Sequence, residues 1–313
     1  MIRSHHVNGI LPSLAHALWL SAVLTAPGCD RTDNNRSPSG VIAATKSIGI
    51  CGDDATLISA IQGTGSASPL TGQGHVIEAV VVGDYQETST TNPSRPELQG
   101  FFVQEEDADK DADPASSEGI FVFDPDKTRE VAEGDLVRVA GKVSEDFGNT
   151  QLENLSGLLN CDSGRPVTPA MVDLPVPLSF ASIDDFWEQY EGMLLSFADV
   201  MTVTGQHELA RYGQLVLSEG GVLREYSQDA ALPLNKADYL AWLDNQARRS
   251  IQLDDFNSQQ NTNPVYHPQP GGFAIENFIR TGAKVNLQGV LEVRFDEWNL
   301  QPQKTAPVVF TNP

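Results

Sequence analysis

Two stretches of this chain share one pattern: residues Gly134–Gly141 read GDLVRVAG and residues Gly282–Gly289 read GAKVNLQG. In each stretch apolar and polar residues alternate between two glycines, which is typical of a half-buried β-strand that runs into a turn. The residues that follow match in type and spacing: Phe147 with Phe295, and Gln151-Leu152 with Asn299-Leu300. Short β patterns can match by chance, but the shared spacing favours duplication of one unit.

Short runs rich in β-branched and aromatic residues surround the first copy, each bounded by Gly, Pro or Asp. These runs are His75–Asp84, Gly100–Gln104, Gly119–Phe123 and Asp135–Val143. Many short strands with turn signals, and no long amphipathic helix, indicate a small barrel or a sandwich. The repeated strand–turn–strand pattern suits an OB-like barrel. We therefore predict an all-β fold with two OB-fold-like small barrels in tandem.

The composition divides the chain into five expected segments. Residues 1–29 are a predicted signal peptide, 30–47 a polar linker, 48–165 the first OB-like domain, 166–189 a proline-rich linker, and 190–313 the second OB-like domain. Stiff proline-rich stretches are typical of interdomain connections. The second domain carries an insert at 222–280 with a helix expected around Lys236–Arg249, and a short helix is expected at Thr56–Ile61.

The N-terminus has the order of a secretory signal. A weakly basic opening precedes the apolar run Ala17–Ala26, and small residues follow before Cys29. A buried N-terminal helix is the alternative. The exit Ala26-Pro27-Gly28-Cys29 resembles a bacterial lipoprotein cleavage box, although Pro27 fits it poorly. An acylated Cys29 would anchor the chain to a membrane without spanning it. We expect an exported protein, with a periplasmic or outer-surface lipoprotein and an extracellular protein both open.

The cysteines are consistent with export. There are three: Cys29, Cys51 and Cys161. If Cys29 is acylated or removed with the signal, one pair remains, and in an oxidising compartment such a pair forms a disulfide by default. Because the pair flanks one β-rich segment, we predict a Cys51–Cys161 bond. Two unrelated buried thiols are the alternative.

The charge of the chain restricts its ligands. There are 42 acidic against 20 basic residues, giving a formal net charge of −22. A field of this sign repels polyanions, which weighs against tight non-specific binding of nucleic acid. A local basic patch, or a site neutralised by bound cations, remains compatible with this charge.

An acidic loop separates the expected strands Gly100–Gln104 and Gly119–Phe123. Its acids are Asp107, Asp109, Asp111, Asp113 and Glu118. Carboxylates at the first, third, fifth and twelfth loop positions, with a backbone carbonyl at the seventh, form the oxygen cage that calcium prefers. Two residues depart from that pattern: Ala112 replaces the usual glycine and Pro114 the usual apolar residue. We predict calcium as a cofactor here; a solvated acidic loop is the alternative.

Aromatic and basic residues offer candidate contacts to nucleic acid. Tyr85 and Phe147 are the aromatics expected to be exposed enough to stack on bases, with Trp298 a weaker candidate. The pair Arg248-Arg249 could contact phosphates. For the arginines we favour the alternative, in which they satisfy nearby carboxylates such as those at 254 and 255.

Catalytic motifs are nearly absent from the sequence. His75, His207 and His267 lie far apart without acidic or histidine partners at metal-ligand spacing. No G-x-S-x-G motif and no phosphate loop occur. We assign no catalytic residue, and whether the chain is an enzyme stays open.

Several segments, taken in order, resemble the N-terminal part of the ExeM/NucH-type extracellular endonucleases of bacteria. The matching segments are Cys51-Gly52, Leu57–Leu70, Val80–Gln86, Gly100–Asp107, Glu118–Val122, Gly134–Val139 and Arg248–Asp255. The resemblance covers roughly residues 50–313 and implies OB-fold domains that precede a metal-dependent endonuclease/exonuclease/phosphatase domain. The catalytic acids, Asn and His of that domain have no matching positions here, because the chain stops at Pro313.

The sequence leaves two functions in competition. The first is an exported nucleic-acid-binding OB-fold module that resembles the non-catalytic front half of a secreted DNA endonuclease, with DNA and a separate nuclease domain as partners. The second is a calcium-stabilised cell-surface or protein-interaction module that does not bind nucleic acid. A natural standalone protein and a truncated nuclease are both open.

Overall fold

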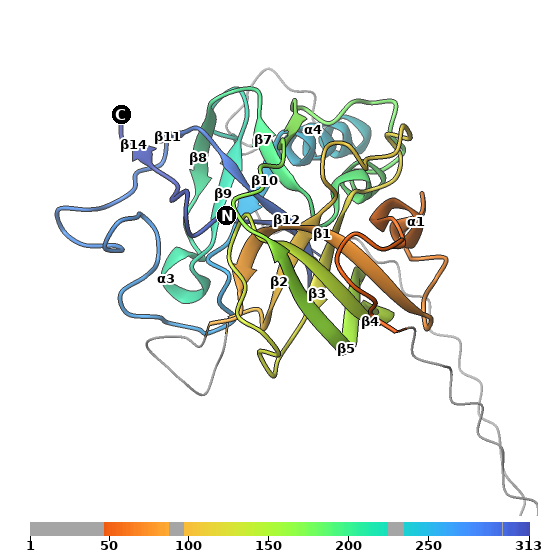
Figure 1. The fold of residues 1–313 in the computed structure, drawn as a ribbon. Helices are drawn as coiled ribbons and strands as arrows, with labels where there is room; N and C mark the ends of the chain where they lie inside the picture. The colour runs from red at the N-terminus through yellow and green to blue at the C-terminus, as the bar shows by residue number, and fades with distance from the viewer. Residues whose placement is uncertain (1–46, 88–96, 225–234, 296) are drawn as a thin grey trace, which may run out of the picture. The chain divides into compact units, whose positions relative to one another are not determined.

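The computed structural model describes residues 47–87, 97–224, 235–295 and 297–313 (Figure 1). The expected signal peptide, Cys29 and nearly all of the polar linker lie outside these residues. Strands dominate the described chain, which confirms the all-β class. No helix among the described residues has the length and apolar character needed to cross a membrane.

The first barrel is closed by five strands. They are β1 (Gly74–Tyr85), β2 (Gly100–Gln104), β3 (Gly119–Phe123), β4 (Leu136–Asp146) and β5 (Asn149–Asp162), joined in the order β1-β2-β3-β5-β4. β3 and β5 run parallel, and the other neighbouring strands run antiparallel. This is the five-stranded arrangement of an OB-like barrel. Helix α1 (Ile58–Gln62) packs Ile58 and Ile61 into its core.

The second barrel repeats this order with two interrupted strands. Its elements are β7 (Leu194–Phe197), β8 (Met201–Gly205), β9 (Leu215–Ser218), β10 (Ser250–Leu253), β11 (Lys284–Val285), β12 (Gln288–Arg294) and β13 (Glu297–Gln301). β7 and β8 are two halves of one strand, as are β11 and β12, since β7 pairs with β12 and β8 with β11. β10 and β13 form the parallel pair. Tandem OB-like barrels are therefore confirmed.

Individual backbone bonds are repeated as well as the strand order. The N–H of Gly134 donates to the carbonyl of Val81 at 2.8 Å, and the N–H of Gly282 donates to the carbonyl of Val203 at 2.8 Å. Gly134 and Gly282 have φ angles of 93° and 94°, which glycine adopts without a Cβ clash. The pairing of the first strand shifts register just after Val81 in one barrel and just after Val203 in the other. These matches support the predicted duplication.

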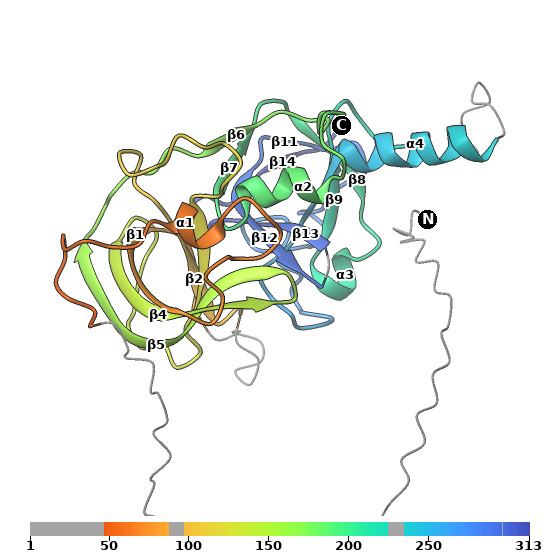
Figure 2. The ribbon, with the colours of Figure 1, turned by 90° about the vertical axis from the view of Figure 1, so that its right-hand side faces the viewer.

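The remaining elements pack around the second barrel. They are β6 (Ala170–Val172), α2 (Asp184–Trp187), the 3₁₀ helix η1 (Glu188–Tyr190), α3 (Leu209–Tyr212), α4 (Lys236–Arg248) and β14 (Phe310–Thr311). β6 pairs with β7, so part of the proline-rich segment belongs to the second sheet. Helix α4 occurs where the sequence predicted it, and Figure 2 shows it extending outward from the second barrel.

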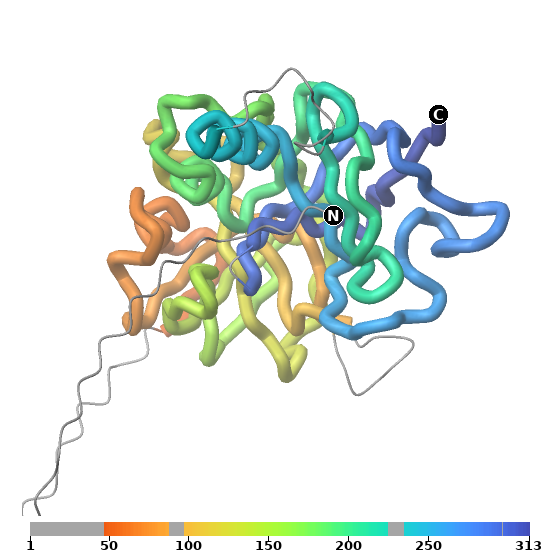
Figure 3. Tube along the Cα trace, turned by 180° about the vertical axis from the view of Figure 1, so that it is seen from behind, coloured from red at the N-terminus to blue at the C-terminus, as the bar shows by residue number. Residues whose placement is uncertain are grey.

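The two barrels share a buried apolar cluster, here called the inter-barrel cluster. It consists of Val82, Tyr85, Leu98, Phe102, Phe121, Leu194, Phe256 and Val290. On β2, Phe101 and Val103 face the interior of the first barrel, whereas Phe102 faces this cluster. Buried hydrogen bonds add to it: the N–H of Leu194 donates to Gln104 Oε1 at 2.8 Å. The traces of both barrels can be followed from behind in Figure 3.

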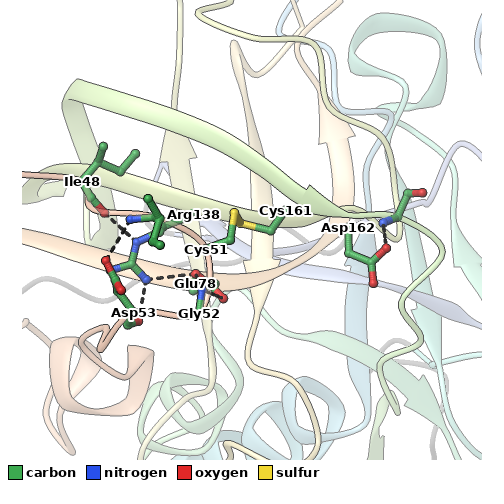
Figure 4. Close-up of a disulfide and its surroundings, with 10 residues drawn as sticks. Ile48, Cys51, Gly52, Asp53, Glu78, Arg138, Cys161 and Asp162 are labelled. Carbon is green, nitrogen blue, oxygen red and sulfur yellow. Dashed lines mark hydrogen bonds and ion pairs between the residues drawn. A yellow bond between two sulfur atoms is a disulfide. The ribbon is translucent and has the colours of Figure 1, made fainter.

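The predicted disulfide is confirmed. Cys51 is bonded to Cys161 at the end of β5, with 5.6 Å between the Cα atoms (Figure 4). Arg138 lies beside it, almost fully buried, and its guanidinium donates to Glu78 Oε2 at 2.9 Å and to the carbonyl of Ile48 at 2.6 Å. A bond closing a loop of 110 residues constrains the unfolded chain, typically by roughly 2–4 kcal/mol. The segment before α1 is thereby fixed to the first barrel.

Candidate functional site

Two exposed phenylalanines lie side by side at the tips of equivalent hairpins. Phe147 follows β4 in the first barrel, and Phe295 follows β12 in the second. Their exposed fractions are 70% and 71%, and their ring centroids are 6.4 Å apart with 45° between the planes. In OB-folds the loop between the fourth and fifth strands is one of the ligand-binding loops. The structure therefore brings the equivalent hairpin tips of both barrels together; we call Phe147 and Phe295 the tip pair.

The backbone at both tips is strained. Phe147 has a φ of 49° and Phe295 a φ of 55°. The pairing of Asp146 with Asn149 leaves a two-residue turn, Phe147-Gly148, in which both φ angles are positive. Such turns strongly favour Asn-Gly, and a left-handed conformation costs a residue with a Cβ about 1–2 kcal/mol. An exposed ring recovers little of this cost by burial, so packing does not account for the strain.

The two hairpins are in contact below their tips. A Cβ placed on Gly148 would lie 3.9 Å from Val293 Cγ2, so the turn of the first barrel rests against β12. Arg294 lies next to Phe295, with its guanidinium carbon 5.9 Å from the ring centroid. Its Nε is 3.4 Å from Glu292 Oε1, and its side chain is 28% exposed. A cation therefore lies at the edge of the tip pair.

Carboxylates surround the base of these hairpins. Burial, with added repulsion from Asp184 and Glu145, raises the pKa of Glu188 to about 7. Glu191 is fully buried and accepts a hydrogen bond from the N–H of Thr150 at 2.5 Å; burial raises its pKa well above the usual range. The repulsion on Glu188 shows that the carboxylates of Asp184, Asp185 and Glu145 lie nearby, and an extended polyanion would meet repulsion from them.

The prediction that Tyr85 is exposed is wrong. Its side chain is fully buried in the inter-barrel cluster, where its ring stacks on Phe256 at 5.2 Å and its hydroxyl donates to the carbonyl of Pro302 at 3.1 Å. Tyr85 therefore cannot stack on a base in this structure. The second barrel covers it, and no local sequence pattern distinguishes a face that meets solvent from one that meets another barrel.

Protein groups hold both arginines of the predicted phosphate contact. Arg248 is buried, and its guanidinium donates to Asp244 Oδ2 at 2.7 Å and to the carbonyl of Pro177 at 2.9 Å. Arg249 donates to the carbonyl of Glu219 and lies 3.6 Å from its carboxylate. Both arginines therefore bind protein groups, as we favoured from the sequence, although their partners are not the carboxylates at 254 and 255. Trp298 also has a structural partner, Asp184 Oδ1 at 3.0 Å.

The acids of the predicted calcium loop are spread over several partners. Asp107 accepts hydrogen bonds from Lys110 Nζ at 2.6 Å and from Thr168. Glu118 Oε1 accepts from the N–H of Asp111 at 2.8 Å. The N–H of Asp109 bonds to a backbone carbonyl, and Asp113 Oδ1 accepts from the N–H of Ala115. Within the described ranges no group of three or more His, Cys, Asp or Glu side chains is arranged to hold a metal ion.

Buried carboxylates that no sequence pattern predicted meet at Gln301. Gln301 Nε2 donates to Asp254 Oδ2 at 3.1 Å and to Glu292 Oε2 at 2.7 Å. Burial raises the pKa of Glu292 to about 7 and also raises the pKa of Asp254 and of Asp255. Burial lowers the pKa of His267 to about 4. In a chain with 42 acidic residues, a buried acid has the same local sequence pattern as an exposed one. No sequence signal therefore predicted that these acids are buried.

The comparisons with known proteins assign no family. No family model and no curated protein matches the chain. Among solved structures, the p204 HINb domain matches with a TM-score of 0.25 and 12% identity, covering 75% of this chain and 96% of that one. A murine DNA-binding protein bound to double-stranded DNA matches with a TM-score of 0.30 and 8% identity, covering 76% and 99%. With TM-scores this low, the two matches support no conclusion about the fold or the ligand of this chain.

Proposed function

We propose that this chain is an OB-like binding module that holds single-stranded nucleic acid at its joined hairpins. The observation that carries the proposal is the tip pair: two exposed aromatic rings at equivalent ligand loops, each held in a strained backbone conformation. Aromatic side chains that stack on bases contribute about 1–3 kcal/mol per base, largely independent of sequence. The inter-barrel cluster covers one face of β2 and β3, so that face of the first barrel is closed to a ligand, whereas the hairpin tips of both barrels are exposed.

The segment order that resembles ExeM/NucH-type endonucleases supports DNA as the nucleic acid. We propose that the module is exported and that it delivers DNA to a separate nuclease domain. The Cys51–Cys161 bond is consistent with an oxidising compartment. A lipid anchor at Cys29 remains part of this proposal.

The charge predicts how such binding would respond to salt. With a net charge of −22 and Arg294 as the cation at the tip pair, few phosphates can be neutralised. For single strands, the slope of log affinity against log salt is about −0.7 per phosphate contact. We expect a slope close to that of one contact, because stacking rather than counterion release provides most of the affinity.

A fluorescence-anisotropy titration tests the proposal. Labelled single-stranded and double-stranded DNA are titrated with the full chain, once with calcium and once with a chelator. We expect the single strand to bind more tightly and Phe147→Ala with Phe295→Ala to weaken binding. Phe273→Ala is the matched control, since Phe273 is also exposed (46%) but lies in the insert of the second barrel. Absence of binding in every condition would contradict the proposal.

A second candidate is a calcium-stabilised cell-surface or protein-interaction module. One observation favours it: Glu118 is buried, and in the part of the chain that the structure describes its Oε2 has no hydrogen-bond partner. A calcium ion bound by Glu118 and the neighbouring loop acids would satisfy that oxygen. This candidate predicts a melting temperature that rises with calcium and no affinity for DNA, so the titration above and a melting curve with calcium distinguish the two functions.

A further inference from the structure

The spacing of the tip pair suits a single planar ring. Stacked bases lie about 3.4 Å apart, so a base held between two rings separates their centres by about 6.8 Å. The centroids of Phe147 and Phe295 are 6.4 Å apart. The planes are tilted by 45°, and exposed side chains reorient on a picosecond to nanosecond timescale. We propose that the two rings clamp one unpaired base between them, with Arg294 contacting the adjacent phosphate. This inference rests on the proposed function.

Strand pairing within the two hairpins fixes the distance between the two tips. The pairing of Asp146 with Asn149 fixes one hairpin, and the pairing of Arg294 with Glu297 fixes the other. The turn at Gly148 rests on Val293, so the two tips are held relative to one another. A site whose parts are already in position loses less conformational freedom on binding. The hairpins that carry the clamp are therefore in position before a base enters, and only the two rings have to reorient.

The charges around the clamp limit the ligand to a short stretch of single strand. Arg294 is partly exposed and pairs through its Nε with Glu292 Oε1 at 3.4 Å, which leaves its terminal amino groups able to face a phosphate. The carboxylates of Glu145, Asp184 and Asp185 lie close enough to Glu188 to raise its pKa, and they repel further phosphates. A base inside a duplex must first be unstacked at a cost of a few kcal/mol, so the clamp favours unpaired bases.

An oligonucleotide that carries one fluorescent base among abasic sites distinguishes a clamp from two separate stacking platforms. In a clamp, the single base needs both rings, so Phe147→Asn and Phe295→Asn should each weaken binding about tenfold, in line with the loss of one stacking face. With two separate platforms, either variant leaves one platform intact and costs at most about twofold, on statistical grounds. Quenching of the base in the wild-type complex should also be relieved in both variants.

Arg294→Gln tests the phosphate contact, with Lys142→Gln as the control because Lys142 is an exposed cation on β4, in the hairpin that carries Phe147. The salt slope should lose about 0.7 in the Arg294 variant and stay unchanged in the control. A wild-type chain that binds the one-base probe while each phenylalanine variant loses twofold or less would overturn the clamp and leave the proposed function standing. A wild-type chain that binds no single-stranded probe would overturn both.

Discussion

The aromatic residues of this protein lie in two contrasting places. Phe102 and Phe121 on the outer face of the first barrel are buried by the second barrel, whereas Phe147 and Phe295 at the hairpin tips are exposed. The first pair has ordinary strand conformations and a clear role in packing. The second pair has strained conformations and contributes little burial. The contrast shows that the barrels pack through their faces and leave their hairpin tips exposed, which supports the proposed binding of a ligand at the tips.

Phe102→Ala should produce the largest effect, by opening the inter-barrel cluster. Phe102 is fully buried and its ring packs on Phe121 at 4.7 Å. Truncating a buried phenylalanine typically costs about 3–5 kcal/mol of unfolding free energy. Urea unfolding followed by tryptophan fluorescence measures the loss, with Phe273→Ala as an exposed control. A loss no larger than that of the control would contradict packing between the barrels.

Cys51→Ser should have the next largest effect on stability. Loss of the bond to Cys161 releases the segment before α1, and we expect a decrease of roughly 2–4 kcal/mol in unfolding free energy. Reduction of the wild-type chain should give the same decrease, and reduction of the variant no further one. Binding at the hairpin tips should persist in the folded variant, since the disulfide lies outside the tip pair.

Glu292 gives the stability of the buried region a pH dependence. Its pKa is raised in the folded state from 4.5 to about 7, with Asp254, Gln301 and Arg294 as the groups that face it. The folded state therefore binds the proton more tightly, and unfolding free energy should fall as the pH rises from 4.5 to 7. Glu292→Gln should remove roughly 1–3 kcal/mol of this dependence.

Thermal and urea unfolding across that range measure the effect, with Glu297→Gln at the exposed hairpin as the control. A variant at Glu292 that retains the full pH dependence would show that Glu292 is ionised in the folded state at neutral pH.

Phe147→Asn should have the smallest effect on stability. Unlike the substitutions above, it should stabilise the protein. Asn adopts a positive φ more readily, and Asn-Gly suits this two-residue turn, so the melting temperature should rise by the equivalent of about 1 kcal/mol. Binding should weaken at the same time. Differential scanning calorimetry with a parallel titration checks both readouts. Lower stability in the variant would mean that the ring has a structural role.

The sequence predicted the repeated barrels because their signals are local. Alternating residues between Gly134 and Gly141, and the same spacing before Phe295, follow from strand and turn chemistry alone. The disulfide followed from counting cysteines. The burial of Tyr85 and of Asp254 could not be predicted, because both depend on how one barrel packs against the other.

The candidate site was predicted in part. The sequence predicts an exposed Phe147 and aligns it with Phe295, but nothing in it brings the two rings together. Their contact arises from packing between duplicated units, which is a long-range property. Arg294 was missed for the same reason.

Photo-cross-linking tests the central claim most directly. A single-stranded oligonucleotide that carries a halogenated uracil is bound to the full chain, irradiated, and the adducts are located by mass spectrometry. The account predicts adducts at Phe147 and Phe295, both lost in the double Asn variant. Adducts confined to helix α4 or to the acidic loop at 107–118 would contradict it.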